Sequence, residues 1–189
     1  TPNCPEAPAK VTKRIIADLD KVFFPEKFVV PFINIVHDRS MLELQRGCLR
    51  GCRFCQAGYV YRPVRSRSPE LLAQYGKAAC EDSGYQEMTL SSLSSTDYPC
   101  LLELCDDLLD YCAPRDIGLS LPSMRADTFS MNLMERLQRV RKGGLTFAPE
   151  AGTQRLRDAI NKNLREEDLL QSVRTAFTGG WNGVKLYFM

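Results

Sequence analysis

The chain has 189 residues, 44% of them hydrophobic, which is enough to build one domain with a packed core and argues against disorder. Its 25 basic and 23 acidic side chains give a formal charge of +2, so no clear basic patch favours nucleic acid or an acidic membrane surface. No stretch approaches the roughly 20 apolar residues of a membrane helix, and no charged-then-apolar leader opens the sequence, so we expect a cytoplasmic protein.

Residues 1–40 are rich in proline and carry one short helical pattern, over residues 11–23. We expect this part to be a lead-in segment that packs over a neighbouring element. The sequence begins with threonine, and its last apolar run, residues 183–189, is followed by no turn or helix. We therefore expect the sequence to be a fragment of a longer protein.

Residues 41–189 alternate between short apolar runs and amphipathic stretches, which predicts a repeated strand–helix unit. Strands are expected at residues 41–45, 86–91, 117–121, 145–148 and 183–189. Helices are expected at residues 71–80, 101–112, 128–137, 153–160 and 166–177, with caps at Ser68, at Asp127 or Thr128, and at Thr153. Strands joined by such helices pair in parallel, as in a (βα) barrel or a doubly wound sheet. Ligands then bind at the carboxyl ends of the strands.

Three closely spaced cysteines, Cys48, Cys52 and Cys55, follow the first predicted strand. Gly47 and Gly51 flank them and allow a loop to wrap closely around a compact inorganic group. Iron–sulfur clusters are normally held by four thiolates, so three local ligands would leave one iron open to bind a substrate. The spacing therefore favours a cluster with an open coordination position.

Other interpretations of the cysteines remain open at this point. Structural zinc sites usually have a second cysteine pair or a downstream histidine, and here the only histidine, His37, precedes the motif. The cysteine run of a bacterial ferredoxin is absent. A non-catalytic iron–sulfur or zinc module for electron transfer or assembly is the alternative function. Eight cysteines in these contexts indicate a reducing compartment rather than a disulfide framework.

The C-x3-C-x2-C spacing, with Phe54 before the last cysteine, resembles the signature of radical S-adenosylmethionine (radical SAM) enzymes. The stretch from Arg46 to Arg65 is similar to a functionally uncharacterised family of cobalamin-binding-type radical SAM proteins, and the similarity runs from about Val11 to the end. This resemblance implies a partial (βα)6 TIM-like barrel, truncated at about the fifth strand, with residues 41–189 as an incomplete core domain.

The resemblance also implies an activity and its cofactors. A 4Fe-4S cluster reductively cleaves S-adenosylmethionine to a 5′-deoxyadenosyl radical, which acts on an unknown substrate by methyl transfer, methylthiolation or another radical modification. The electron comes from a reducing partner such as flavodoxin or ferredoxin. The Asp-x-His-x-x-Gly cobalamin motif is absent, so any cobalamin would bind through a region outside this sequence.

By the same resemblance, Cys48, Cys52 and Cys55 ligate the cluster and Phe54 packs near the adenine of the cofactor. Small polar groups after the second strand bind the methionyl amine in related enzymes. Ser92 and Ser94 occupy that place here, although a serine-rich turn that caps the next helix is the alternative.

Later strands end in further candidate cofactor contacts. Ser123 and Arg125 follow the third strand, and Arg125 is expected to bind the cofactor carboxylate or, alternatively, an acid on a neighbouring helix. Glu150 and Arg155 follow the fourth strand, in a segment that resembles the ribose-binding segment of methylthiotransferases. Arg155 would clamp the carboxylate unless it pairs with Asp158 on the surface.

Several other side chains are expected to be structural. Cys105 and Cys112 share one face of the predicted helix at residues 101–112, which favours buried packing over a second cluster built with Cys100. His37 is expected to be a hydrogen-bonded lead-in residue rather than a base. Lys185 faces either side of the last strand, depending on register.

Overall fold

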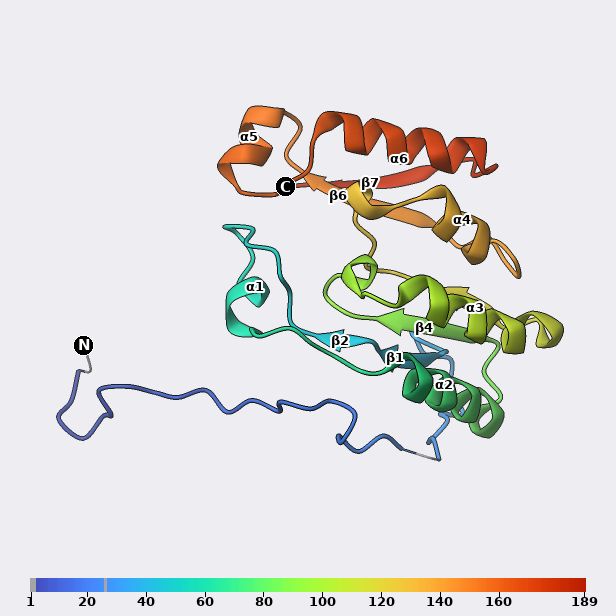
Figure 1. Ribbon diagram of the computed structural model, residues 1–189, viewed down its shortest axis with the longest axis horizontal. Coiled ribbons are helices and arrows are strands. Elements are labelled where there is room, and N and C mark those ends of the chain that lie inside the picture. The colour runs from blue at the N-terminus through green and yellow to red at the C-terminus, as the bar shows by residue number, and fades with distance from the viewer. Residues whose placement is uncertain (1–2, 26) are drawn as a thin grey trace.

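The computed structural model describes residues 3–25 and 27–189, which form an α/β fold with parallel strands (Figure 1). The five main strands are β1 (Ser40–Glu43), β4 (Glu87–Ser91), β5 (Gly118–Ser120), β6 (Leu145–Glu150) and β7 (Val184–Phe188). The longer helices are α2 (Pro69–Ser83), α3 (Leu101–Cys112), α4 (Met131–Leu137) and α6 (Glu166–Thr178). The short elements are β2 (Gln45–Arg46), α1 (Ala57–Val60), β3 (Arg65–Ser66), α5 (Gln154–Ala159), and the 3-10 turns η1 (Ser95–Asp97), η2 (Ala113–Arg115) and η3 (Ala126–Thr128).

The five main strands form two parallel sheets rather than one closed barrel within the described residues. One sheet has the order β1-β4-β5 and the other pairs β6 with β7, while β2 and β3 form a separate antiparallel ribbon. Hydrogen bonding stops between β5 and β6. β5 ends at Ser120, two residues before Pro122, whose nitrogen cannot donate to a neighbouring strand.

One part of the core lies between the sheet β1-β4-β5 and the helices α2 and α3, and the same buried cluster continues through α4 and β6 to α6. Leu42 and Leu90 are neighbours in register on the buried face. Gly76 allows α2 to approach this face, because a Cβ atom at that position would lie 2.9 Å from Leu42 Cδ1. The apolar runs that predicted these strands therefore match the packing, and all five predicted strands are present.

The helix ends follow the sequence signals in part. Thr153 caps α5 by accepting a hydrogen bond from the Leu156 N–H, as predicted. The predicted cap at Asp127 or Thr128 is wrong, because both residues lie in η3 and Ser130 caps α4 instead. Ser68 precedes α2, but its side chain makes no capping hydrogen bond.

The lead-in is not helical in its described part, so the helix predicted over residues 11–23 is wrong. Of its apolar side chains, Leu19 is buried, whereas Val11 and Phe23 are largely exposed. A short helix needs a packed apolar face for stability, and this segment has one anchor instead. Phe24 stacks on Tyr75 of α2 with ring centroids 4.2 Å apart, which brings the end of the segment against that helix.

None of the helices in the described part of the chain is long and apolar enough to cross a membrane.

Candidate functional site

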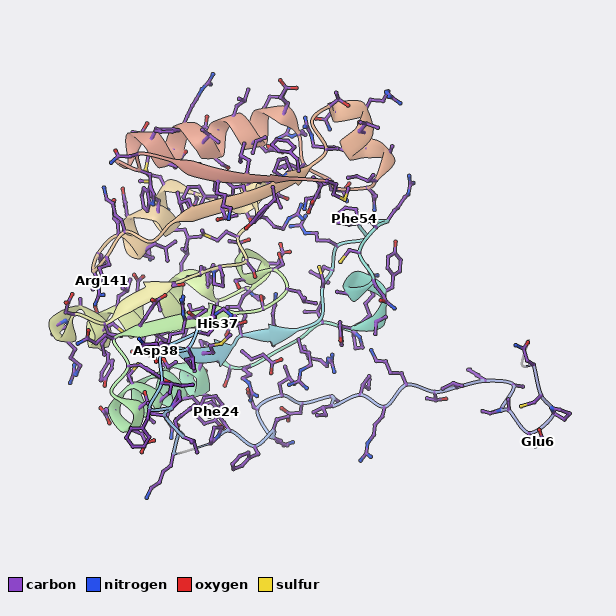
Figure 2. The ribbon with its side chains drawn as sticks, turned by 180° about the vertical axis from the view of Figure 1, so that it is seen from behind. Glu6, Phe24, His37, Asp38, Phe54 and Arg141 are labelled. Carbon is purple, nitrogen blue, oxygen red and sulfur yellow. The ribbon has the colours of Figure 1, made fainter. Side chains whose placement is uncertain are left out.

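A cavity of about 310 Å³ lies at the carboxyl ends of the strands and is lined by all three cysteines of the motif. Phe54, Ser94, Ser123, Arg125 and Glu150, all expected from the sequence to contact the cofactor, also line it. They come from the loops after β2, β4 and β5 and from the last residue of β6, which are far apart in the sequence. Figure 2 shows Phe54 on the cysteine loop, between the carboxyl edges of the two sheets.

Glycine shapes the loop that carries the cysteines. Gly47 has φ +105°, and a Cβ atom there would lie 2.4 Å from the Tyr61 carbonyl oxygen. Gly58 in α1 lies directly behind the loop, where a Cβ atom would be 2.6 Å from the Arg50 carbonyl oxygen. The loop is therefore pressed against residues 58–63 on the side away from the cavity.

Arg50, between the first two cysteines, ties the loop to the ends of β4 and β5. Its guanidinium donates two hydrogen bonds to the Asp97 carboxylate and lies 3.3 Å from Asp127 Oδ2. Burial disfavours the charged form of Asp97, but hydrogen bonds from Arg50 and Ser94 outweigh burial and lower the pKa of that carboxyl. The cysteine loop is thus held by a charge-assisted contact, in which the Asp97 carboxylate stays ionised at neutral pH.

The serines after β4 have different surroundings. Ser94 lines the cavity, and its hydroxyl donates to Asp97 Oδ2 at 2.7 Å. Ser92 does not line the cavity; its Oγ accepts the Ser94 N–H at 3.1 Å and pairs with the Ser95 hydroxyl. Ser92 therefore has the contacts of the serine-rich turn considered above, while Ser94 lies where a cofactor contact was expected.

Arg125 lines the cavity, but its guanidinium is already engaged. It forms two hydrogen bonds with Asp127 and donates to the backbone carbonyls of Lys162 and Asn163. This matches the alternative of a nearby acid, although Asp127 belongs to η3 rather than to a neighbouring helix. Its expected contact with the cofactor carboxylate stays a prediction.

Glu150 ends β6 with φ +67°, a conformation that a side chain with a Cβ rarely adopts. Its carboxylate accepts a hydrogen bond from Lys162 Nζ at 3.1 Å, and the same ammonium lies 5.9 Å from the Phe54 ring centroid. Lys162 was missed from the sequence. The sequence places Lys162 between Asn161 and Asn163, and asparagine is a residue type that tolerates positive φ, so a tight turn could have been expected there. Both asparagines have positive φ in the structure.

Arg155 does not line the cavity and is exposed. Arg157, two residues later, is instead 2% exposed and donates to the carbonyls of Ala151 and Leu164. This buried arginine stabilises the segment between β6 and α6. That segment in turn contacts the cysteine loop, because the Asn161 side chain donates to the Gly51 carbonyl at 2.7 Å.

The residues set apart as structural lie outside the cavity. Burial raises the pKa of the Cys105 thiol to about 12 and that of Cys112 to about 11, as expected for packing side chains. Cys100 is partly buried beside the core. His37 is exposed and lies away from Phe54 (Figure 2). Its backbone carbonyl accepts a hydrogen bond from Arg39, and its imidazole has no partner among the described residues.

The register of β7 places Lys185 opposite Thr146 of β6. Thr146 lines the cavity, whereas Val184 and Leu186 pack toward the core, so Lys185 lies on the cavity side of the sheet. Tyr187, on the same face, lines the cavity.

The three cysteines line one cavity, so their thiols could serve together as ligands of one metal group. In the described part of the chain, no three His, Cys, Asp or Glu side chains converge on one ion-sized position. A tetrahedral zinc ion needs its thiolates within about 2.3 Å of a common centre, whereas a cluster binds each cysteine at a different iron. Three cysteines spread around one cavity, on a loop with closely packed glycines, are compatible with the latter.

The chain is similar to two proteins of Methanocaldococcus jannaschii. It is 34% identical to the uncharacterised protein MJ0966 over 187 residues, which are 94% of this chain and 40% of that protein. It is 24% identical over 144 residues to MJ0865, provisionally named a methylthiotransferase, with 71% of this chain and 31% of that protein covered. The chain thus spans less than half the length of these relatives.

Two solved structures share the fold. The radical SAM methyltransferase TsrM from Kitasatospora setae, with cobalamin and a 4Fe-4S cluster bound, has a TM-score of 0.62 and 12% identity over 79% of this chain and 30% of that one. The cobalamin-dependent radical SAM enzyme OxsB, with aqua-cobalamin and S-adenosylmethionine bound, has a TM-score of 0.59 and 15% identity over 78% of this chain and 23% of that one.

The sequence model of the radical SAM superfamily matches residues 42–189, which include the three cysteines, the last two residues of β1 and every later strand of the described chain. This match confirms the resemblance noted from the cysteine spacing. The chain belongs to the radical SAM superfamily.

Proposed function

We propose that the protein containing this chain is a radical SAM enzyme in which Cys48, Cys52 and Cys55 hold a 4Fe-4S cluster. The observation that supports this best is the single cavity lined by the three cysteines and by Phe54, Ser94, Ser123, Arg125 and Glu150. Membership of the superfamily implies both the cluster and S-adenosylmethionine. When bound, the cluster supplies the electron that cleaves S-adenosylmethionine to a 5′-deoxyadenosyl radical.

Within this proposal the chain's own residues bind and orient the cofactor. Phe54 packs against the adenine, and Ser94 and Ser123 offer hydroxyl groups to the methionyl end. Glu150 accepts hydrogen bonds from the ribose hydroxyls, because an ionised carboxylate is an acceptor only. Lys162 holds the Glu150 carboxylate in place within the cavity. Ser92 and Arg155 take no part in this arrangement, since neither lines the cavity.

We infer that β1, β4, β5, β6 and β7 are five strands of a (βα)6 barrel of the radical SAM type. The parallel order, the connecting helices and the TM-scores of 0.62 and 0.59 support this assignment. The gap between β5 and β6 leaves these strands as a partial barrel.

Methyl transfer and methylthiolation are both candidate reactions, because relatives with these names match the chain in structure or sequence. Cobalamin would bind through a region outside this chain. A small electron carrier such as flavodoxin or ferredoxin would supply the electron. Thiolate ligands need a reducing compartment, which supports a cytoplasmic location.

Anaerobic reconstitution tests the proposal. The chain is loaded with iron and sulfide, reduced, and given S-adenosylmethionine. The expected result is an electron paramagnetic resonance (EPR) signal of a 4Fe-4S cluster that changes when the cofactor is added, together with released 5′-deoxyadenosine. Two results would favour the non-catalytic module: the full-length protein binds zinc instead, or the EPR signal of its cluster does not change when S-adenosylmethionine is added.

Two cysteine variants sharpen the experiment. Cys52→Ala removes a proposed ligand at the cavity, whereas Cys105→Ala removes a thiol that is fully buried between α3 and the sheet. We expect the first variant to lose the cluster and the second to keep it. Equal loss in both variants would contradict the division between ligand and core cysteines.

A further inference from the structure

The backbone carbonyls of the cysteine loop are held by side chains that are not part of the cysteine motif. Arg62 Nη2 donates to the Leu49 carbonyl at 3.0 Å and to the Arg50 carbonyl at 3.2 Å, while its Nε donates to the Gly58 carbonyl at 2.6 Å. Asn161 Nδ2 donates to the Gly51 carbonyl at 2.7 Å. Three consecutive carbonyls of the loop are therefore fixed by two side chains.

Fixing these carbonyls also fixes the amide groups. In a trans peptide the C=O and the following N–H point in opposite directions, so the N–H groups of Arg50, Gly51 and Cys52 point away from Arg62 and Asn161. The Arg50 N–H donates to Cys48 Sγ at 3.4 Å. The N–H groups of Gly51 and Cys52 donate to no acceptor among the described residues.

The packing behind the loop supports the same orientation. The Arg50 carbonyl lies against Gly58, where an added Cβ atom would be 2.6 Å from the oxygen. A peptide flip that turned this carbonyl toward the cysteines would lose the hydrogen bond from Arg62. The direction of the loop dipoles is thus built in without the cluster.

We propose that Arg62 and Asn161 are positioning residues that aim the loop's N–H groups at the cluster thiolates and thereby raise the cluster's reduction potential. This inference rests on the proposed function. A reduced cluster carries one more negative charge than the oxidised form, so N–H donors near its sulfur atoms stabilise the reduced form more. The same donors hold the thiolates in place.

The test compares two asparagines that share a backbone conformation. Asn161 and Asn163 both have positive φ, which glycine adopts without strain, but only Asn161 has a side-chain hydrogen bond to the loop among the described residues. Asn161→Gly removes that hydrogen bond, and Asn163→Gly is the matched control. Arg62→Lys keeps the positive charge but loses the planar group that reaches three carbonyls.

The reconstituted chain is measured by redox titration with EPR detection and by the rate of iron loss to a chelator. We expect Asn161→Gly and Arg62→Lys to have a more negative midpoint potential and to lose iron several-fold faster than the unaltered chain and Asn163→Gly. Unchanged potential and EPR spectrum in both variants would overturn the inference. Failure of the unaltered chain to bind a 4Fe-4S cluster would instead overturn the proposed function.

Discussion

The Arg50 guanidinium and the Asp97 carboxylate face each other in a two-point contact, with Nε–Oδ2 at 3.0 Å and Nη2–Oδ1 at 2.5 Å. Their side chains are 25% and 10% exposed, so water screens the pair only in part. The contact joins the middle of the cysteine motif to η1 at the end of β4. It therefore connects the proposed ligand loop to the end of the β1-β4-β5 sheet.

Removal of one partner from this pair should destabilise the chain strongly. Arg50→Leu leaves the Asp97 carboxylate without its main cation, and we expect a loss of about 3 kcal/mol in the free energy of unfolding. Urea unfolding without metal measures this loss. Arg139→Leu is the control, because its pair with Asp110 is exposed, and it should cost less than about 1 kcal/mol. Equal losses in the two variants would show that the Arg50–Asp97 pair contributes no more to stability than the exposed Arg139–Asp110 pair.

The buried thiol of Cys105 predicts a loss of stability at alkaline pH. Burial raises the pKa of Cys105 to about 12 from an ordinary value of 9.0, so the folded chain keeps a proton that the unfolded chain releases. The contribution of the protonated thiol to the free energy of unfolding is fully present below pH 9. It is lost as pH rises toward 12, at up to about 1.4 kcal/mol per pH unit. In Cys105→Ala, the free energy of unfolding should fall less steeply from pH 9 to 11. Parallel pH curves would contradict the burial effect.

The pattern of apolar runs and amphipathic stretches was sufficient for the five main strands and the longer helices, because these elements bury apolar side chains in the core. It also located the loops after β2, β4, β5 and β6, since ligands in such folds lie at the carboxyl ends of strands. It failed for the lead-in, where the apolar pattern has no packing partner except at Leu19. It also missed Arg62, Arg157 and Lys162, whose roles depend on hydrogen bonds and ion pairs that have no periodic signal.

Two substitutions of Glu150 separate the effect of its backbone conformation on stability from the effect of its carboxylate on cofactor binding. Both Glu150→Ala and Glu150→Gly remove the carboxylate that Lys162 contacts, but only glycine adopts φ +67° freely. We expect the glycine variant to be more stable than the alanine variant by about 1 kcal/mol in urea unfolding. On reconstituted protein, both should weaken the effect of S-adenosylmethionine on the cluster EPR signal. Equal stability of the two variants would contradict strain at this position.

Arg157, rather than Arg155, should carry the stability of the segment between β6 and α6. Arg157 is 2% exposed and satisfies the carbonyls of Ala151 and Leu164, whereas Arg155 is exposed on α5. Arg157→Met keeps most of the apolar stem but removes the donor to the part-buried Ala151 carbonyl and one of the two donors to the Leu164 carbonyl, which also accepts from Gln154 Nε2 at 3.3 Å. We expect a cost of about 1 to 3 kcal/mol. Arg155→Met should change the free energy of unfolding by less than about 0.5 kcal/mol.

A second measurement separates local from global effects of Arg157. The segment it supports carries Asn161 and Lys162, which contact Gly51 and Glu150 at the cavity. Hydrogen exchange in Arg157→Met should therefore speed up in residues 151–166 and in the cysteine loop, while the β1-β4-β5 sheet keeps its protection. Uniform loss of protection across the chain would show that Arg157 supports the whole fold rather than the wall of the site.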